Sequence, residues 1–305
     1  MGASDPIQTS WVRKYSALLA MKPQQMDSRF IGKVFQETNV GSGIYLFDRF
    51  GEIESQEVTT RFGDTPHNAI DYRRRGMYVR TFDTGRLVDG EDKLRAAIDP
   101  TSKIMQAMVA KLYQDMDDVI NTAFWADVLE MDEEEVISVS SFPSENVVAV
   151  TEQSGAGSGA CGLNAEKLRA AQEILQTGEV TGEIYCGVTP KQVRSMMSDP
   201  EYTNADYNAL QPLMSGRMVD FYGVKFFLSN RILKDSNNYD RIPLFRSDAM
   251  RWGWGEGADI TGEILKRPDK KGLPNLYAKF NGGCAREHDE GLVEIKCAQT
   301  GPTAA

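Results

Sequence analysis

Apolar residues recur at spacings of three and four from residue 99 to residue 129, which predicts one long amphipathic helix. Asp99 can cap its first free backbone N–H groups, and Pro100 suits the first helical position because it has no N–H to leave unpaired. At 1.5 Å per residue this helix would be roughly 45 Å long, so we expect it to be the spine of the fold. An ordinary long core helix would show the same periodicity. The polar face is acidic and carries Asp115, Asp117 and Asp118.

Two segments before this helix alternate between apolar and polar residues, which predicts strands at residues 44–58 and 77–88. Residues 59–75 between them are rich in Gly, Asp, Pro and Arg and are too many for a tight hairpin turn. We therefore interpret residues 51–88 as an extended two-stranded arm. Because an isolated two-stranded ribbon is marginal in water, the arm needs another surface to lie on.

The predicted arm ends in a basic tip, formed by Arg73, Arg74, Arg75 and Arg80. In a chain whose net charge is −10, such a tip favours an acidic protein surface as its partner. A solvated turn and a nucleic-acid patch are the alternatives.

Helix and strand signals alternate after the spine. Asn164 is placed to cap a helix that runs to residue 177, and Gly178 is placed to end it. Thr189 opens a capping-box pattern for a second helix that ends before residue 200. The predicted strands are residues 147–150, 183–188, 218–228 with a bulge at Gly223, 260–265, 276–280 and 292–297.

Composition narrows the function classes. The chain has 305 residues, of which 41% are hydrophobic, enough for one large domain or two of ordinary size. A net charge of −10 argues against a protein whose main task is to neutralise phosphates. No run approaches the ~20 apolar residues that span a bilayer, and residues 1–10 lack the features of a secretory signal, so we expect neither a membrane span nor export.

Cysteine and histidine are scarce and scattered. Four cysteines, Cys161, Cys186, Cys284 and Cys297, form no C-x-x-C pair, so we expect reduced thiols in a cytoplasm and neither a disulfide framework nor a zinc site. The only histidines are His67 and His288, which we interpret as a loop residue and part of a solvated turn. We therefore expect no catalytic residues, no cofactor and no metal.

One glycine motif suggests a different function. Gly157, Gly159 and Gly162 fit G-x-G-x-x-G, which would make the chain a nucleotide-binding α/β oxidoreductase. In such a site the strand runs straight into the first glycine, whereas six residues intervene between the predicted strand 147–150 and Gly157. The surrounding Gly/Ser-rich composition is typical of a flexible loop. A soluble ligand-binding module is a third alternative.

Several short motifs occur in an informative order. Asp-Lys-Leu-Arg at residues 92–95 and Ile-Asp-Pro-Thr-Ser at 98–102 precede the long helix, which contains Met-Asp-Asp at 116–118. Val-Thr-Pro-Lys-Gln at 188–192 and Arg-Pro-Asp-Lys at 267–270 follow. Together with the basic arm, this order resembles the major capsid proteins of tailed bacteriophages with the HK97-type fold, over nearly the whole chain.

The resemblance implies an α+β, HK97-like capsid fold in five parts. These are an N-terminal arm (1–50), an extended β-hairpin loop (51–90), a peripheral domain with the spine helix (91–130), a mixed α/β axial domain (131–258), and late strands that return to the peripheral domain, with a tail (259–305). The implied function is structural: self-assembly into hexamers and pentamers of an icosahedral head that encloses double-stranded DNA without sequence-specific binding. It also implies assembly in the host cytoplasm. Separate scaffolding, portal and decoration proteins are the candidate partners, and assembly without a scaffolding protein is the alternative.

Charge complementarity suggests how the subunits meet. We expect the basic arm of one subunit to dock on the acidic helix face of a neighbour. The candidate interface residues are Arg73, Arg74, Arg75, Arg80, Asp115, Asp117 and Asp118.

Two further expectations come from the resemblance. In the family's founding example, a Lys on the extended loop forms an isopeptide bond with an Asn of another chain. Residues 51–90 contain no lysine, and a guanidinium is a poor nucleophile, so we expect no such crosslink here. Helix-like sequence starts at Trp11, so we expect no built-in scaffold of domain size.

Overall fold

The computed structural model describes most of the chain. The described residues are 24–41, 43–51, 55, 57, 72–87, 101–132, 134, 136–153, 159–179, 182–198, 219–255, 260–270 and 272–299. The predicted terminal helix at 11–21, the helix start at Asp99 and Pro100, and Gly157 lie outside these residues.

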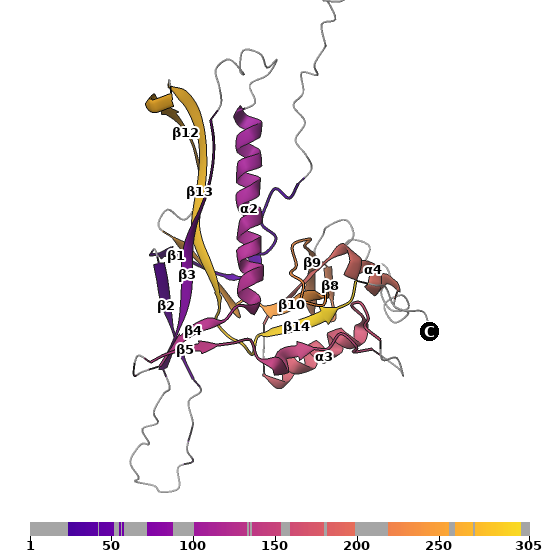
Figure 1. The fold of residues 1–305 in the computed structure, drawn as a ribbon. Coiled ribbons are helices and arrows are strands. Elements are labelled where there is room, and N and C mark those ends of the chain that lie inside the picture. Colours follow the sequence, from indigo (N-terminus) through magenta and orange to yellow (C-terminus); the bar gives the residue numbers. More distant parts are fainter. Residues whose placement is uncertain are drawn as a thin grey trace, which may run out of the picture.

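In the described part of the chain, two β-sheets are arranged around one long helix, α2 (Thr101–Trp125). Figure 1 shows α2 standing beside the long strands of the larger sheet, with the smaller sheet and two shorter helices gathered at one end of it. Among the described residues, the 3₁₀ helix η1 (Ile31–Lys33) precedes the first strand, whereas η2 (Ser144–Asn146) and η3 (Pro268–Lys270) link strands.

The larger sheet is organised around strand β3. Its eight strands among the described residues are β1 (Phe35–Val40), β2 (Gly43–Phe50), β3 (Tyr72–Leu87), β4 (Val128–Met131), β5 (Ile137–Ser140), β11 (Met250–Gly255), β12 (Thr261–Arg267) and β13 (Leu273–Arg286). From Arg80 to Leu87, β3 pairs with β13, and from Tyr72 to Val79 it pairs with β2. The first half of β3 also pairs with β4, which pairs with β5, so β2, β3, β4 and β5 form a short four-stranded sheet.

The smaller sheet carries its own core. Its strands, in spatial order, are β6 (Val147–Val148), β14 (Leu292–Cys297), β10 (Asp240–Arg246), β7 (Ile184–Val188), β9 (Val224–Leu228) and β8 (Val219–Phe221). Helices α3 (Ala165–Thr177) and α4 (Pro190–Ser198) pack on it and bury residues such as Leu168, Val193 and Met196.

The apolar stripe of α2 is buried, as predicted. Met116, Ile120 and Phe124 are fully buried in a cluster that includes Phe280 of the larger sheet. The same cluster reaches the smaller sheet, since the rings of Phe124 and Phe245 lie 4.9 Å apart. The helix therefore ties the two sheets together through one shared core.

The local start and stop signals are confirmed. The Asn164 side chain accepts a hydrogen bond from the backbone N–H of Lys167 at 2.8 Å, and the Gly178 N–H closes α3 on the carbonyl of Ile174. The Thr189 hydroxyl caps α4 by accepting from the N–H of Gln192 at 3.4 Å.

Several predicted boundaries are wrong. The spine ends at Trp125, because the next residues form β4 against β3. The predicted strand 218–228 is a hairpin, β8 and β9, joined at Tyr222 and Gly223, which both have positive φ as a two-residue turn requires. The predicted strand 276–280 lies within the 14-residue β13, which extends it at both ends, and the predicted strand 44–58 ends at Phe50.

The five-part division of the chain remains a prediction. Sheet membership crosses its last boundary in both directions: β11 precedes residue 258 and lies in the larger sheet, whereas β14 follows it and lies in the smaller one. The connection from β13 to β14 therefore passes from one sheet to the other.

Candidate assembly surfaces

The short sheet of β2, β3, β4 and β5 has two very different faces. The register pairs Arg75 with Phe47 and with Glu130, so these three side chains share one face. It pairs Gly76 with Leu46 and with Leu129, so these lie on the opposite face. The first face turns toward the rest of the subunit, and its residues Phe47 and Met77 pack in a small core.

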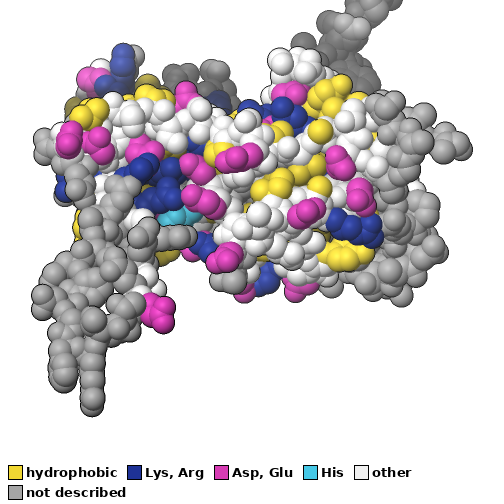
Figure 2. Space-filling model, turned by 90° about the horizontal axis from the view of Figure 1, so that it is seen from below, with side chains coloured by type: hydrophobic (Ala, Val, Ile, Leu, Met, Phe, Trp, Pro, Cys, Tyr) yellow, Lys and Arg dark blue, Asp and Glu magenta, His cyan; other side chains and the backbone are white. Residues whose placement is uncertain are grey.

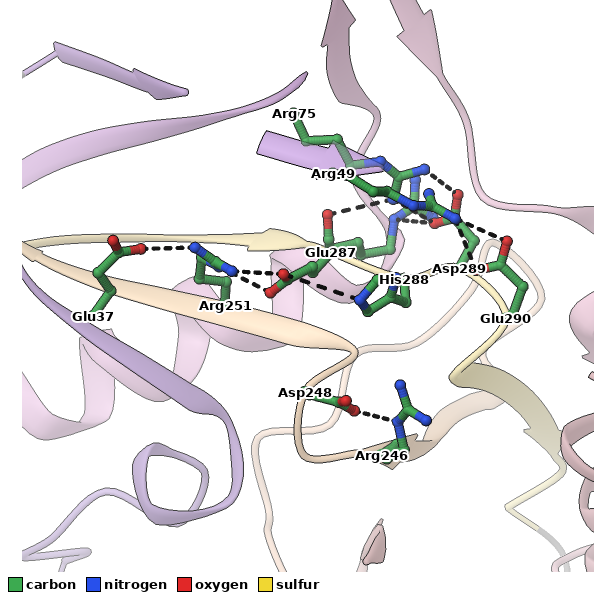
Figure 3. Close-up of polar contacts among 11 residues, drawn as sticks. Glu37, Arg49, Arg75, Arg246, Asp248, Arg251, Glu287, His288, Asp289 and Glu290 are labelled. Carbon is green, nitrogen blue, oxygen red and sulfur yellow. Dashed lines mark hydrogen bonds and ion pairs between the residues drawn. The ribbon is translucent and has the colours of Figure 1, made fainter. Parts of the chain in front are cut away.

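The inward face carries a buried ion pair at the connection between the two sheets. Arg75 is 2% exposed and donates two hydrogen bonds to the Asp289 carboxylate, at 3.2 and 2.7 Å. Asp289 lies in the turn between β13 and β14, so this pair fixes that turn to β3 (Figure 3).

A second buried arginine depends on the same carboxylate. Arg286, at the end of β13, is fully buried, and its Nε lies 3.4 Å from Asp289 Oδ1. Its Nη2 donates to the Ser140 carbonyl at 3.1 Å, whereas Nε and Nη1 have no hydrogen-bond partner among the described residues. Burial lowers the pKa of Arg286, and Asp289 opposes that shift. We call Arg75, Arg286 and Asp289 the joint.

Further charged pairs surround the joint. Arg49 Nη2 lies 3.1 Å from Glu290 Oε1, and Arg251 Nη2 lies 2.6 Å from Glu287 Oε1. His288 lies among them (Figure 3), and burial lowers its pKa while Glu287 opposes the shift. Figure 2 shows this region from below as a group of Lys and Arg side chains beside a histidine, with acidic side chains around it.

The opposite face of the short sheet is apolar and exposed. It presents Ile44, Leu46, Tyr78, Ile137 and Val139, whose exposed fractions range from 41% to 63%, and we call these five residues the uncovered face. Gly76 lies between them: a Cβ there would be 3.2 Å from Leu129 Cβ and 3.4 Å from Leu46 Cδ2. The apolar side chains thus converge over a glycine.

A groove joins the uncovered face to the last turns of α2. It has a volume of about 270 Å³, and Tyr78 belongs to both. Its apolar wall includes Phe82, Val119, Ala123 and Val128. Its charged lining comprises Arg80, Asp115, Asp118 and Asp127. The groove therefore combines an apolar floor with a mainly acidic rim.

Asp117 does not face this groove. It is fully buried and accepts hydrogen bonds from the backbone N–H of Arg29, at 3.0 Å, and of Phe30, at 3.4 Å, and from the Gln25 and Ser28 side chains. It thereby fastens residues 25–30 to the spine helix.

The predicted interface residues fall into separate groups. The expected position of the arginines at an arm tip is wrong, because residues 72–79 form the paired start of β3. Arg73 Nη1 lies 3.8 Å from Glu130 Oε1, and Arg74 Nε lies 2.9 Å from Asp48 Oδ1. Only Arg80, Asp115 and Asp118 come together, in the groove. Within the chain, Asp115 also pairs with Lys111, and Asp118 with Arg231.

Sequence reasoning missed the joint. Residues 286–290 read Arg-Glu-His-Asp-Glu, and the sequence interpretation of His288, between Glu287 and Asp289, is a solvated turn. Its one distinguishing signal was the density of charge between two predicted strands, which does not reveal that Arg286 and Asp289 are buried.

The glycine motif serves packing. A Cβ on Gly162 would lie 2.2 Å from Ser195 Oγ, so the residue allows α4 to approach. The N–H of Leu163 donates to the Gln192 side chain at 2.9 Å, and Lys167 Nζ donates to the Cys161 carbonyl at 2.8 Å. The groups near the start of α3 are thus occupied by the chain itself, and the oxidoreductase alternative has no support.

The part of the chain that the structure describes contains neither a metal-site cluster nor a membrane-spanning helix. No three His, Cys, Asp or Glu side chains there gather as a metal site requires. No helix there is both long and apolar enough to cross a bilayer.

Solved structures that this chain resembles include phage capsids. The capsid of cyanophage P-SCSP1u superposes with a TM-score of 0.72 and 11% identity, over 95% of this chain and 94% of that chain. The capsid of Ralstonia phage GP4 superposes with a TM-score of 0.71 and 13% identity, over 100% of this chain and 99% of that chain. A structure from Mycobacterium phage Che8 superposes with a TM-score of 0.67 and 15% identity, over 96% of this chain and 99% of that chain. The HK97-like α+β fold predicted from the sequence is therefore confirmed.

Sequence comparison gives the family. A search of curated proteins finds no match. The family model described as phage capsid protein matches residues 7–299, which is nearly the whole chain. The chain therefore belongs to the phage capsid protein family, and it is a structural capsid protein of a phage head.

Proposed function

We propose that copies of this chain assemble through hexamers and pentamers into an icosahedral shell that encloses double-stranded DNA. The observation that carries this proposal is the uncovered face. Soluble monomers rarely expose large contiguous apolar patches. Here five large apolar side chains, each at least 41% exposed, form such a patch on one face of the short sheet. Burial between copies in a shell accounts for their exposure in one copy.

The charge of the chain supports the same function. A net charge of −10 suits a wall that surrounds DNA without adhering to it, and it opposes sequence-specific DNA binding. We propose a purely structural role with no catalytic site.

The groove is the place where charged contacts between copies are proposed. Arg74 and Arg80 lie on the uncovered side of β3, and Asp115 and Asp118 line the groove beside it. Arg73, Arg75 and Asp117 complete the proposed set from within the subunit, since they hold the strands and the N-terminal segment that present this surface. Exposed pairs contribute only ~0.2–1 kcal/mol each, but a shell repeats them many times.

The proposal extends to partners and location. Assembly takes place in the host cytoplasm, with separate scaffolding, portal and decoration proteins as the partners. The absence of lysine from residues 51–90 supports a shell held by non-covalent contacts. Mature particles boiled in detergent and reductant should then give one band near 33.9 kDa, and a ladder of covalent multimers would contradict this part.

Electron microscopy of the purified protein tests the proposed function. A shell protein gives rings or closed particles. A homogeneous small oligomer under all assembly conditions, combined with calorimetric binding of NAD or NADP, would instead favour an enzyme.

A further inference from the structure

A second apolar site lies at the far end of the larger sheet. Ile264 of β12 is 58% exposed, and Leu265, on the opposite face of the strand, is 50% exposed. Figure 1 shows β12 and the start of β13 as a hairpin that projects beyond the sheet, at the end opposite to β4 and β5. This exposed apolar site and the uncovered face therefore lie at opposite ends of the larger sheet.

These two sites have complementary charges. The hairpin end carries Lys266, Arg267 and Lys270, all exposed. Asp269 in the same segment accepts two hydrogen bonds from Arg267, at 3.0 and 2.7 Å, so Lys266 and Lys270 carry the excess positive charge. The groove beside the uncovered face has a rim that includes Asp115, Asp118 and Asp127. Lys266 beside the exposed Ile264, on one face of β12, matches an apolar floor with an acidic rim.

Different patches at opposite ends of one subunit can satisfy each other only in a head-to-tail contact. Such a contact forms closed rings when its rotation closes, whereas a contact of one patch with itself stops at a dimer. A ring is what hexamers and pentamers need, so this arrangement agrees with the proposed shell.

We propose that the β12–β13 hairpin end of one copy docks on the uncovered face and groove of a second copy. This inference rests on the proposed function, because it names the partner of a surface that the shell is proposed to bury. Ile264 contacts the uncovered face, and Lys266, which shares its face of β12, lies against the acidic rim.

Disulfide trapping tests the contact in assembled particles. Ile264→Cys and Val139→Cys are combined in one chain, and the particles are oxidised with copper phenanthroline. Non-reducing gels should show a ladder from dimers upward, ending at the ring size, because each copy links to the next. Each single variant should stay monomeric or stop at dimers.

A matched control separates proximity from random collision. Lys279→Cys lies on β13 of the same sheet and is also exposed, but its register with Asp83 places it on the other face from Ile264, which pairs with Leu276. Combined with Val139→Cys, it should give no ladder. Wild-type particles report any linkage through native cysteines, three of which are buried.

The possible failures are distinguishable. Normal particles from the Ile264→Cys and Val139→Cys chain without a ladder would overturn this inference and leave the shell function standing. An equal ladder from the Lys279→Cys control would overturn it as well. Failure of the wild-type chain to assemble under any condition would contradict the proposed function, and this inference with it.

Discussion

The two faces of the short sheet formed by β2, β3, β4 and β5 reverse the usual distribution of side chains. The inward face buries Arg75 against Asp289, whereas the outward face exposes Leu46 and Val139. Charged residues are almost never fully buried unless they are paired, and the inward arginine is paired. The difference separates two tasks: the charged face fixes the subunit's own two sheets, and the apolar face is left for another copy.

The two faces also differ in when their free energy becomes available. The joint is complete in a single subunit, because all three of its residues belong to one chain. The uncovered face gains only on association, by about 1.5–3 kcal/mol for each large apolar side chain that becomes fully buried. The comparison therefore predicts that changes to the inward face alter subunit stability and that changes to the outward face alter assembly.

Asp289→Ala should have the largest effect on the isolated subunit. It removes the carboxylate that two buried arginines share, and breaking a buried pair in this way costs about 3–5 kcal/mol. Urea unfolding of the unassembled subunit measures the loss. Glu290→Gln, one residue away, is the control. The Glu290 side chain is 57% exposed in its pair with Arg49, so this change should alter the free energy of unfolding little. A loss below about 1 kcal/mol for Asp289→Ala would contradict the role of the joint.

Asp117→Ala should have an intermediate effect. The substitution leaves the N–H groups of Arg29 and Phe30 without their acceptor, at a cost of about 1–3 kcal/mol. Hydrogen exchange should show faster exchange at these two amides. Asp115→Ala, on the groove side of the same helix, should leave both amides protected, and equal exchange in the two variants would refute the distinction between buried and groove carboxylates.

His288 should add a small pH dependence to the joint. Burial lowers its pKa below the ordinary value of 6.5, so the unfolded chain takes up a proton before the folded chain does. Stability is therefore lost as the pH falls below about 6.5, through the lowered pKa, and His288→Asn should remove that loss. Glu287, Glu290, Asp248 and Arg49 also act on this site. Melting curves at pH 7.5 and pH 5.5 for both proteins provide the check.

Lysines on the uncovered face should have the smallest effect on the subunit. Ile137→Lys with Val139→Lys places two charges where the side chains are 63% exposed, so unfolding should shift by no more than about 0.5 kcal/mol. Particle formation should nevertheless fail, because both charges would be buried between copies. Ser138→Lys, on the intervening residue of the same strand and also exposed, is the matched control. Normal particles from the double variant would show that this face stays open in the shell.

Local signals explain which parts of the fold were predictable. The apolar stripe of α2 and the Asn164 cap of α3 depend on residues three or four positions apart, so the sequence displays them directly. The joint depends on Arg75 and Asp289, which are 214 residues apart, and no local pattern connects them.

The uncovered face was hidden for a different reason. Alternation around Tyr45 and Phe47 predicts a strand, but it does not tell which face the rest of the chain covers. Val139 lies in β5, a four-residue strand that we did not predict, next to an acidic run that gives no strand signal. The groove residues Arg80, Asp115 and Asp118 were among the candidates because charge is visible in sequence, whereas their common position comes from packing α2 on β3.

Hydroxyl-radical footprinting of free subunits and assembled particles tests the central claim most directly. Oxidation of Tyr78 and Leu46 on the outward face is compared with oxidation of Met77 and Phe47 on the inward face of the same two strands. The account predicts that the outward pair reacts in the free subunit and becomes protected in the particle, while the inward pair is protected in both. Equal reactivity of Tyr78 and Leu46 in subunits and particles would contradict it.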